Sequence, residues 1–352
     1  MSTQLSTRRV DTPMRRQRGF NLIELLIGLT ISLMGLAAVS QVMMTFSKKR
    51  AAITQTMATQ DNGVMALYRL ERDLAQAGYG FMTLQGCSSI GNGTNPTLSP
   101  LPVSIGDGGT GADSITVQYA NSASGIPGTE LSISGGYTMT TSQYNVRSNV
   151  GFAVGDRVVA TNACALSTVN GPCAGLCPTG TLLTSGVIIS YTYPSALAAS
   201  ANAGYLANLG PDGSLISRRY QVDTATSALT VGEYPAFTAN NLVDDIVLLK
   251  AEYGLAASST GVVVTSWVNG TTAISNTNSN RVIAVRVGVV ARSSLRENEV
   301  IDQPASITVL PAVTDSGGTQ IGAAVTYAPP DTRYRYRAYS TVIPLRNVIW
   351  TR

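Results

Sequence analysis

Histidine is absent from this sequence of 352 residues, and lysine occurs only as Lys48, Lys49 and Lys250. The absence of histidine excludes Ser-His-Asp, Cys-His and His-metal chemistry. Charged residues make up only 12 % of the chain, about half the usual quarter. The sequence also has no Gly-x-Ser-x-Gly elbow, and the glycines within 106–111 lack the Lys-Ser/Thr of a phosphate loop. We therefore expect no enzymatic activity, no cofactor and no metal.

The positive charge lies at one end of the chain. The net charge is +4, and residues 1–19 alone carry +4, from five arginines against Asp11. The remainder is neutral, so the basic composition gives no reason to expect a nucleic-acid partner. The 34 glycines, together with many serines and threonines, are typical of a β-rich body with frequent turns.

A long apolar run extends from Phe20 to Phe46, and Glu24 is its only ionisable residue. About 20 apolar residues are enough to cross a bilayer as a helix. An ordinary secretory signal has an apolar region of roughly 7–15 residues, so this run fits poorly, although residues 38–40 imitate a cleavage site. A plain anchor leaves Glu24 unexplained, because a carboxylate in the membrane costs several kcal/mol and normally marks function.

The residues around this carboxylate form a specific motif. At residues 16–25 (RQRGFNLIEL) the sequence resembles the prepilin cleavage motif of type IV pilins and type II secretion pseudopilins. The resemblance implies that a prepilin peptidase cuts between Gly19 and Phe20 and that Phe20 is then N-methylated. Glu24 becomes the fifth residue of the mature chain. Its partner cation would be the ammonium group of Phe20, or that of the same residue in a neighbouring subunit. Asn21 departs from the family, which more often has Thr or Ser here.

Flanking charges predict the orientation of the chain in the membrane. Residues 1–19 form the leader, and we expect Met14 rather than Met1 to be the initiator, which shortens the leader to Met14–Gly19. Five arginines precede the apolar run, whereas only Lys48, Lys49 and Arg50 follow it. By the positive-inside rule the N-terminus stays in the cytoplasm. We expect a single-pass protein of the bacterial inner membrane with a periplasmic body.

The apolar run continues into an amphipathic helix, so one helix is expected from about Phe20 to Ala77. Its buried stripe is predicted from apolar residues that recur every three to four positions, namely Ile53, Met57, Val64, Leu67 and Leu74, joined by Met65 and Tyr68. Its solvated face is predicted from four charged residues, Arg69, Glu71, Arg72 and Asp73, with Arg69 and Asp73 spaced as an i, i+4 pair.

After residue 80 the sequence alternates between short apolar runs and turns. The expected strands are 114–119, 155–160, 182–191, 215–222, 242–253, 281–291 and 333–343. The run 281–291 is almost continuously apolar, which predicts a central strand. The expected fold is therefore α+β and pilin-like, with a long N-terminal helix packed on a mainly antiparallel sheet with long loops. The predicted segments are 1–19 as leader, 20–46 as membrane or filament-core helix, 47–80 as its amphipathic continuation, and 81–352 as one periplasmic body or two intimately packed lobes.

Several segments resemble one branch of this superfamily, the PilW-type minor pilins. They are 77–79, 155–159, 242–254, 282–290 and 342–347. Segments 121–150, 166–180 and 255–280 match nothing recognisable. The resemblance implies a minor pilin that joins other minor pilins in a complex that primes polymerisation of the major pilin and stays near the tip. Alternatives are a type II secretion pseudopilin and a recognition module at the pilus tip, which binds DNA or a surface, with a tip-associated adhesin as a further partner.

Four cysteines, all beyond the apolar run, suit disulfides in an oxidising compartment. They are Cys87, Cys164, Cys173 and Cys177, and they allow three pairings. Cys173 and Cys177 lie close enough to close a local loop, which leaves Cys87 to pair with Cys164. A zinc site is the rival interpretation, but the sequence has no histidine to complete it.

Three further patterns have an ordinary structural interpretation beside a functional one. Asp107 and Asp113 could bind calcium, but a turn with solvated carboxylates is favoured because EF-hand spacing is lacking. The run 333–337 (RYRYR) could stack single-stranded DNA, but a strand with tyrosines packed on one face and arginines in water is favoured. The acidic pairs Asp244-Asp245 and Glu297/Glu299 are expected at solvated edges.

Overall fold

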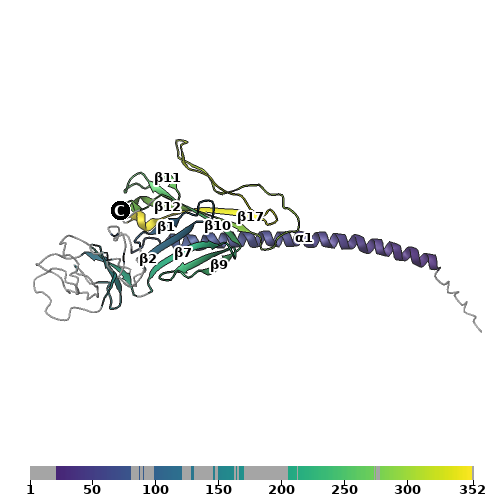
Figure 1. Ribbon diagram of the computed structural model, residues 1–352, viewed down its shortest axis with the longest axis horizontal. Coiled ribbons are helices and arrows are strands. Elements are labelled where there is room, and N and C mark those ends of the chain that lie inside the picture. Colours follow the sequence, from purple (N-terminus) through teal and green to yellow (C-terminus); the bar gives the residue numbers. More distant parts are fainter. Residues whose placement is uncertain are drawn as a thin grey trace, which may run out of the picture. The chain divides into compact units, whose positions relative to one another are not determined.

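The computed structural model in Figure 1 describes most of the helix and of the sheets. The described residues are 21–80, 87, 90, 99–120, 128–130, 146, 150–161, 164, 166–169, 205–211, 213–272, 274 and 278–350. The chain divides into two units, Met1–Thr54 and Gln55–Arg352. The expected strand at 182–191 lies outside the described residues.

Helix α1 (Leu22–Leu74) is a single helix, slightly shorter than the predicted span, and turns follow it to Gly80. The described strands pair antiparallel. A five-stranded sheet has the order β1 (Val103–Gly106), β2 (Ser114–Ala120), β7 (Leu215–Asp223), β8 (Ala228–Glu233), β9 (Asn240–Asp244). A four-stranded sheet has the order β11 (Val264–Val268), β10 (Ile246–Ala256), β12 (Val282–Arg292), β17 (Tyr336–Pro344).

Smaller elements complete the second unit. A four-stranded sheet has the order β3 (Gly128–Glu130), β6 (Tyr205–Gly210), β4 (Arg157–Ala160), β5 (Leu166–Thr168). Two ribbons pair β13 (Ile307–Leu310) with β16 (Val325–Tyr327), and β14 (Val313–Thr314) with β15 (Gln320–Gly322). Two short helical segments are η2 (Ser279–Arg281) and α2 (Arg346–Trp350). The fold is α+β, a long N-terminal helix with antiparallel sheets, as predicted.

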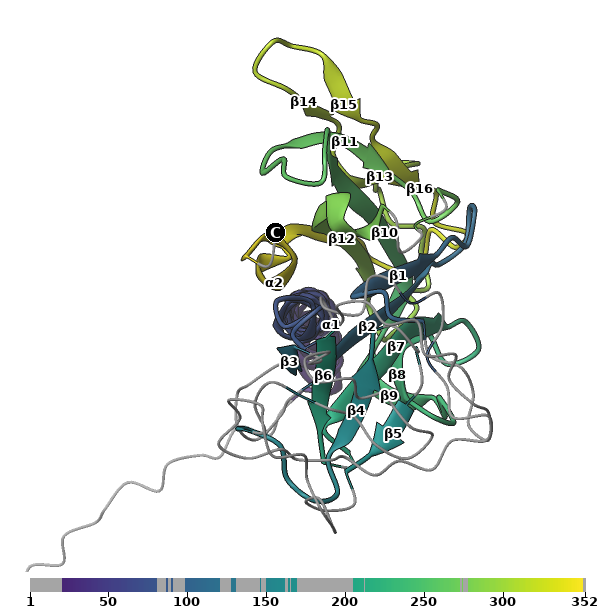
Figure 2. The same cartoon turned by 90° about the vertical axis from the view of Figure 1, so that its left-hand side faces the viewer.

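The main core lies between the second half of α1 and the two larger sheets (Figure 2). Ala66, Leu70 and Leu74 of the helix are fully buried against apolar residues of both sheets, such as Val117 and Val287. Strand β12 is buried along almost its whole length, as a central strand should be.

The buried face of α1 differs from the predicted stripe. The helix buries Thr59, Gly63, Ala66, Leu70, Asp73 and Leu74. Of the residues expected to be buried, five are instead exposed, namely Ile53, Met57, Val64, Met65 and Tyr68. Small residues explain the difference, because a Cβ at Gly63 would overlap the ring of Tyr339 on β17. The sheets pack against the helix where small side chains allow close approach, and not where the side chains are most apolar.

Asp73 was expected in water but is a buried anchor between helix and sheet. It accepts hydrogen bonds from the Tyr220 hydroxyl at 2.5 Å and from Arg218 Nη1 at 3.1 Å. Arg218 also pairs with Glu233, at 2.7 Å. Burial and the hydrogen bond to Asp73 raise the pKa of Tyr220. The carboxylate can be buried because tyrosine and arginine donors on the sheet surround it.

Two strand expectations are corrected as well. The run 242–253 is not one strand, because Asp245 has a positive φ of 59° and separates β9 from β10. The last strand begins at Tyr336 rather than at residue 333. The segment before it is held by side chains, since Arg335 pairs with Glu297 at 2.7 Å and the Arg292 guanidinium lies 4.5 Å from the Tyr334 ring centroid.

Candidate functional site

Glu24 lies in the first turn of α1, where its backbone N–H donates to the Asn21 carbonyl at 2.9 Å. Gly19 and Phe20 lie outside the described residues. From Leu25 to Leu29 the exposed large side chains of the helix are all apolar, and α1 is long and apolar enough to cross a membrane. The helix therefore presents one carboxylate at the start of an exposed apolar surface.

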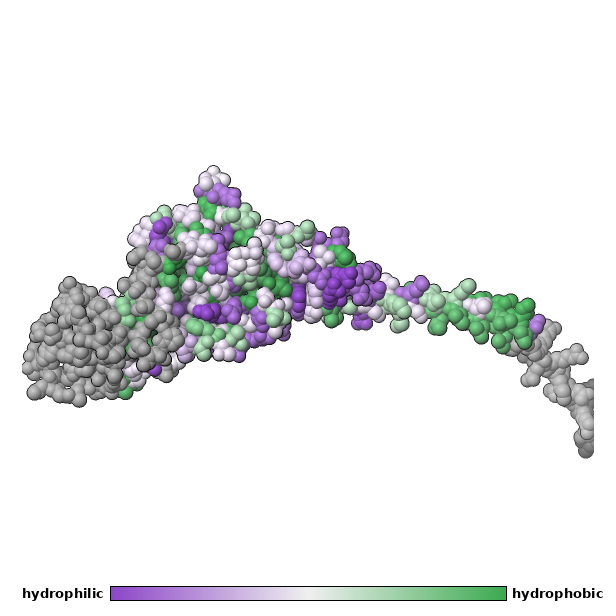
Figure 3. All heavy atoms as spheres, in the orientation of Figure 1, coloured by the Kyte–Doolittle hydropathy of each residue, from purple (hydrophilic) through white to green (hydrophobic). Residues whose placement is uncertain are grey.

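The first half of α1 exposes all its large apolar side chains, with exposed fractions from 53 to 76 % between Leu22 and Phe46. Figure 3 shows these apolar residues gathered on the N-terminal part of the helix. Some of its hydroxyl groups turn back onto the helix, since those of Thr30 and Ser40 donate to the carbonyls of Ile27 and Leu36. An exposed apolar surface this extensive marks contact with lipid or with other protein chains.

The second half of α1 keeps a narrower exposed apolar stripe on the side away from its core. Met57, Val64, Met65 and Tyr68 have exposed fractions of 47 to 59 %. These are the residues that the sequence pattern assigned to the core. Their exposure gives the second unit an apolar helix surface of its own.

Cys87 and Cys164, the pair predicted from the sequence, form a disulfide in the structure. Both lie in a second, small core with Ile90, Val159 and Leu209. The disulfide joins the segment after α1 to the β4 region and closes a loop of 77 residues. In the chain-entropy model a loop of this length stabilises the fold by about 4 kcal/mol. Cys173 and Cys177 lie outside the described residues.

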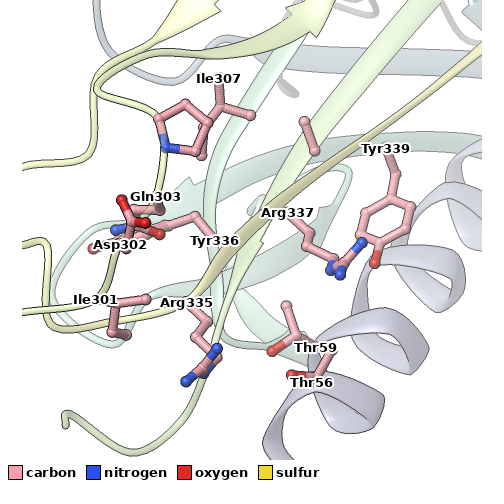
Figure 4. A pocket seen from close by; sticks show the side chains of 12 residues that line it. Thr56, Thr59, Ile301, Asp302, Gln303, Ile307, Arg335, Tyr336, Arg337 and Tyr339 are labelled. Carbon is pink, nitrogen blue, oxygen red and sulfur yellow. The ribbon is translucent and has the colours of Figure 1, made fainter. Parts of the chain in front are cut away.

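A recess of about 360 Å³ lies beside the helix in the second unit (Figure 4). Thr56 and Thr59 of α1, the segment 301–304, Ile307 and residues 335–339 line it. Among the described residues, two buried polar atoms of its lining lack a hydrogen-bond partner, namely Gln303 Nε2 and the Tyr339 hydroxyl. Burial raises the pKa of Tyr339, and the nearby Arg337 opposes that rise. The recess can accept a few polar groups or water molecules.

The carboxylates singled out as possible calcium ligands have a structural role. Asp113 is buried rather than solvated, and it pairs with Lys250 Nζ at 2.8 Å. It also accepts the backbone N–H groups of Gly108 and Ala251, at 2.9 and 3.0 Å. The carboxylate already accepts hydrogen bonds from a lysine and two backbone amides. Its role is therefore to hold the loop between β1 and β2 in place. Among the described residues no cluster of three metal-ligating side chains occurs.

The tyrosines of the RYRYR run pack together as predicted, although Tyr334 precedes strand β17 rather than lying in it. The rings of Tyr334 and Tyr336 lie 6.4 Å apart at their centroids, and burial raises the pKa of Tyr336 to about 12. The arginines differ from the prediction, because Arg335 is bound to Glu297 while Arg337 is exposed. Because Glu297 is paired with Arg335, it is not simply a solvated carboxylate at an edge, as the sequence had suggested.

Comparison with known proteins gives two family matches. Residues 14–40 match the prokaryotic N-terminal methylation motif, and residues 205–347 match the family described as type IV pilus-assembly protein W. The PilW-type recognition is confirmed. The PilW match contains the segments 242–254, 282–290 and 342–347, and it also runs through 255–280, where no resemblance was expected. The segments 77–79 and 155–159 lie outside it.

Among solved structures, the chain is similar to a type IV-like pilin from Thermus thermophilus, at 11 % sequence identity and a TM-score of 0.37. The alignment covers 82 % of this chain and 96 % of that one. No curated protein sequence matches the chain. The chain thus combines an N-terminus that matches the methylation motif, a helix long and apolar enough to cross a membrane, and a disulfide-bonded antiparallel body.

Proposed function

We propose that this PilW-type chain is a minor pilin that works in a complex with other minor pilins. In this proposal, a prepilin peptidase cuts between Gly19 and Phe20, and Phe20 is N-methylated. The first half of α1 is held in the bacterial inner membrane, with the N-terminus cytoplasmic and the body periplasmic. The complex primes polymerisation of the major pilin and remains near the pilus tip.

The observation that carries this proposal is the exposed apolar surface of α1 with Glu24 inside it. Such a surface suits lipid before assembly and neighbouring helices afterwards, because both environments exclude water. The carboxylate then needs a cation in a medium of low dielectric constant, and the N-terminal ammonium group of a neighbouring subunit can supply it. Glu24 thereby sets how far each subunit advances into the complex.

Substitution of Glu24 by Gln tests this mechanism, because it keeps the shape and removes the charge. The variant should still insert and be processed, since cleavage reads the Gly19–Phe20 junction. Its recovery with other pilins and in sheared pili, relative to its membrane level, should fall by about tenfold or more. Thr30→Val is the matched control, because the Thr30 hydroxyl bonds only to its own helix among the described contacts. Wild-type assembly of Glu24→Gln would refute charge pairing in this subunit.

Deletion of the protein separates this function from the alternatives. Loss of surface pili supports the minor-pilin proposal. Loss of exoprotein secretion with pili intact would instead identify a secretion pseudopilin. Normal pili with lost adhesion or DNA uptake would identify a recognition module, with a tip-associated adhesin as its candidate partner.

A further inference from the structure

Strand β12 is apolar along its buried length except for one arginine. Arg286 is 1 % exposed and is the largest fully buried side chain among the described residues. Its Nε and Nη2 bond to Glu252 Oε2 at 2.9 and 2.6 Å, and Glu252 lies directly opposite on β10. The guanidinium also lies 5.4 Å from the Trp267 ring centroid. Burying this ion pair carries a large desolvation cost. The other hydrogen bonds of the Arg286 guanidinium help to offset that cost, and they show which segment the guanidinium holds in place.

The remaining donors of Arg286 hold both ends of one hairpin. Nη1 donates to the Pro311 carbonyl at 2.8 Å, and Nη2 donates to the Ala323 carbonyl at 2.7 Å. We call residues 311–323, which include β14 and β15, the arm. Gly322 in its base packs so closely that a Cβ there would lie 2.9 Å from Trp267 Cδ1. One guanidinium therefore fixes the direction in which the arm leaves the sheet.

Beyond this base the arm stands out from the four-stranded sheet (Figures 1 and 2). All residues from Thr314 to Gln320 are exposed. The tip has a defined turn nevertheless, because Asp315 Oδ1 accepts the N–H groups of Gly317 and Thr319 at 2.9 and 2.8 Å. Gly318 adopts the positive φ of 82° that this turn requires. A hairpin without its own core is marginally stable, so the clamped base and the capped tip keep it extended.

The chemistry of the arm indicates its partner. Among the described strands, β14 and β15 pair only with each other, so their outer edges carry backbone groups that can pair with another chain. Its single ionisable side chain, Asp315, is occupied by its own turn. Contact therefore uses backbone, hydroxyl, amide and small apolar groups rather than an ion pair. Antiparallel sheets of the kind seen here end in outer strands that suit such pairing, as β9 does in this chain.

We propose that the arm docks on the outer strand of a neighbouring pilin subunit's sheet and that Arg286 is its positioning residue. The proposal rests on the proposed function, because it presupposes a complex of pilins. It assigns to the body a contact separate from the helix contacts of α1.

Truncation of the arm tests the proposal without disturbing its base. Replacement of residues 314–321 by Asn-Gly leaves Pro311, Ala323 and the Arg286 network in place. The full-length variant should be processed and should unfold at the wild-type temperature. Its co-purification with other pilins should fall by about tenfold or more. Wild-type co-purification would overturn the proposal.

A pair of matched single substitutions separates loss of tip shape from a general effect of loosening a hairpin. Asp315→Ala removes the cap of the arm, and Asp223→Ala removes a similar cap from the β7–β8 turn. There, Asp223 accepts the Ala225 N–H at 2.9 Å and the Thr226 hydroxyl at 2.8 Å. We expect reduced co-purification only for Asp315→Ala. Equal effects of the two substitutions would overturn the specific role of the arm.

Photo-crosslinking detects the contact directly, and a purely structural role of the arm would produce no crosslink. A benzophenone side chain at Thr319 should yield an adduct with another pilin in the membrane, whereas one at Ala225 should not. In an Arg286→Lys background, which keeps a positive charge but cannot reach both carbonyls together, the adduct should fall severalfold. An adduct with a protein other than a pilin would overturn the proposed partner. The same adduct yield in the Arg286→Lys background would overturn the positioning role of Arg286.

The two proposals fail in different ways. If deletion of the whole protein leaves piliation intact, the proposed function is wrong. If deletion abolishes piliation and the arm-truncated chain restores it fully, the proposed function stands and the arm has no docking role.

Discussion

The two halves of helix α1 differ in what surrounds them, although both carry large apolar side chains. From Leu22 to Phe46 every such side chain is exposed. In the second half, one face is fully buried, as at Ala66 and Leu70, while Val64 and Tyr68 remain exposed. The helix thus has a buried side only along part of its length.

The comparison shows that close fit decides which side of the helix meets the sheets. Gly63 and Ala66 let the strands approach, and Asp73 completes that face because tyrosine and arginine donors meet it. Leu70 and Leu74 also lie on that buried face, whereas Val64 and Tyr68 lie on the remaining, exposed surface. A surface that a folded chain leaves apolar is available to lipid or to other chains. Cleavage before the helix can be tested apart from this division, and substitutions on the inner and outer sides test the division itself.

The largest effect is expected in the sequence that precedes the first half of the helix. Gly19→Val should leave the precursor uncut, because a branched side chain would crowd the cleft of the prepilin peptidase. No mature chain should then appear, whatever the fold of the body. Mass spectrometry of the membrane-extracted protein measures this directly. A mature N-terminus at Phe20 in the variant would refute the dependence on Gly19, and one at Gln41 in the wild type would indicate an ordinary secretory signal.

The sequence was sufficient for the parts of the fold that local pattern controls. The apolar run and the alternating segments predicted α1 and strands such as β2 and β12 with nearly the observed bounds. It was not sufficient to predict the buried side of the helix. That side includes small residues such as Gly63, which is buried because Tyr339, far along the chain, packs directly against it. Asp73 and Asp113 were misassigned for the same reason, since their partners Tyr220 and Lys250 are distant in sequence.

Arg286 was the most informative residue that sequence reasoning missed. A lone arginine in an apolar strand, with a glutamate in the paired strand, signals a buried ion pair. That signal could have been read only with the register of β10 and β12. The carbonyl partners that give it meaning belong to a third segment, so no local pattern contains them.

The second prediction compares the inner and outer sides of the helix directly. Leu70→Ala should destabilise the protein by about 3 kcal/mol, because it leaves a cavity in the core. Val64→Ala on the outer side should change stability by less than about 0.5 kcal/mol. Urea unfolding of the detergent-solubilised chain, followed by tryptophan fluorescence, measures both. Similar losses for the two variants would show that the outer side is also packed.

The third prediction concerns the polar part of the inner side. Asp73→Asn keeps the size of the side chain but weakens its bonds to Tyr220 and Arg218. We expect a loss of about 2 kcal/mol, since a charged hydrogen-bond acceptor is removed from buried donors. Asp61→Asn on the exposed side of the same helix is the control and should be nearly neutral. If Asp73→Asn is also neutral, the anchor does not contribute to stability.

The smallest effect appears only in alkaline solution, and it depends on the same anchor. Burial, and then the hydrogen bond to Asp73, raise the pKa of Tyr220 above its usual value of 10.0. Above pH 10 the unfolded chain releases this proton while the native chain keeps it, so stability must fall as pH rises. Each pH unit can remove up to about 1.4 kcal/mol through this one group. Tyr220→Phe has no proton to release at this position, so its unfolding free energy should fall less steeply between about pH 10 and 11. Tyr253 also has a raised pKa, but its hydroxyl bonds to the Ile105 N–H and it contributes equally to both proteins. The difference in slope therefore reports the tyrosines around Asp73, which are Tyr220 and its neighbour Tyr119. Identical slopes would mean that the Tyr220 hydroxyl is not buried against Asp73 in solution.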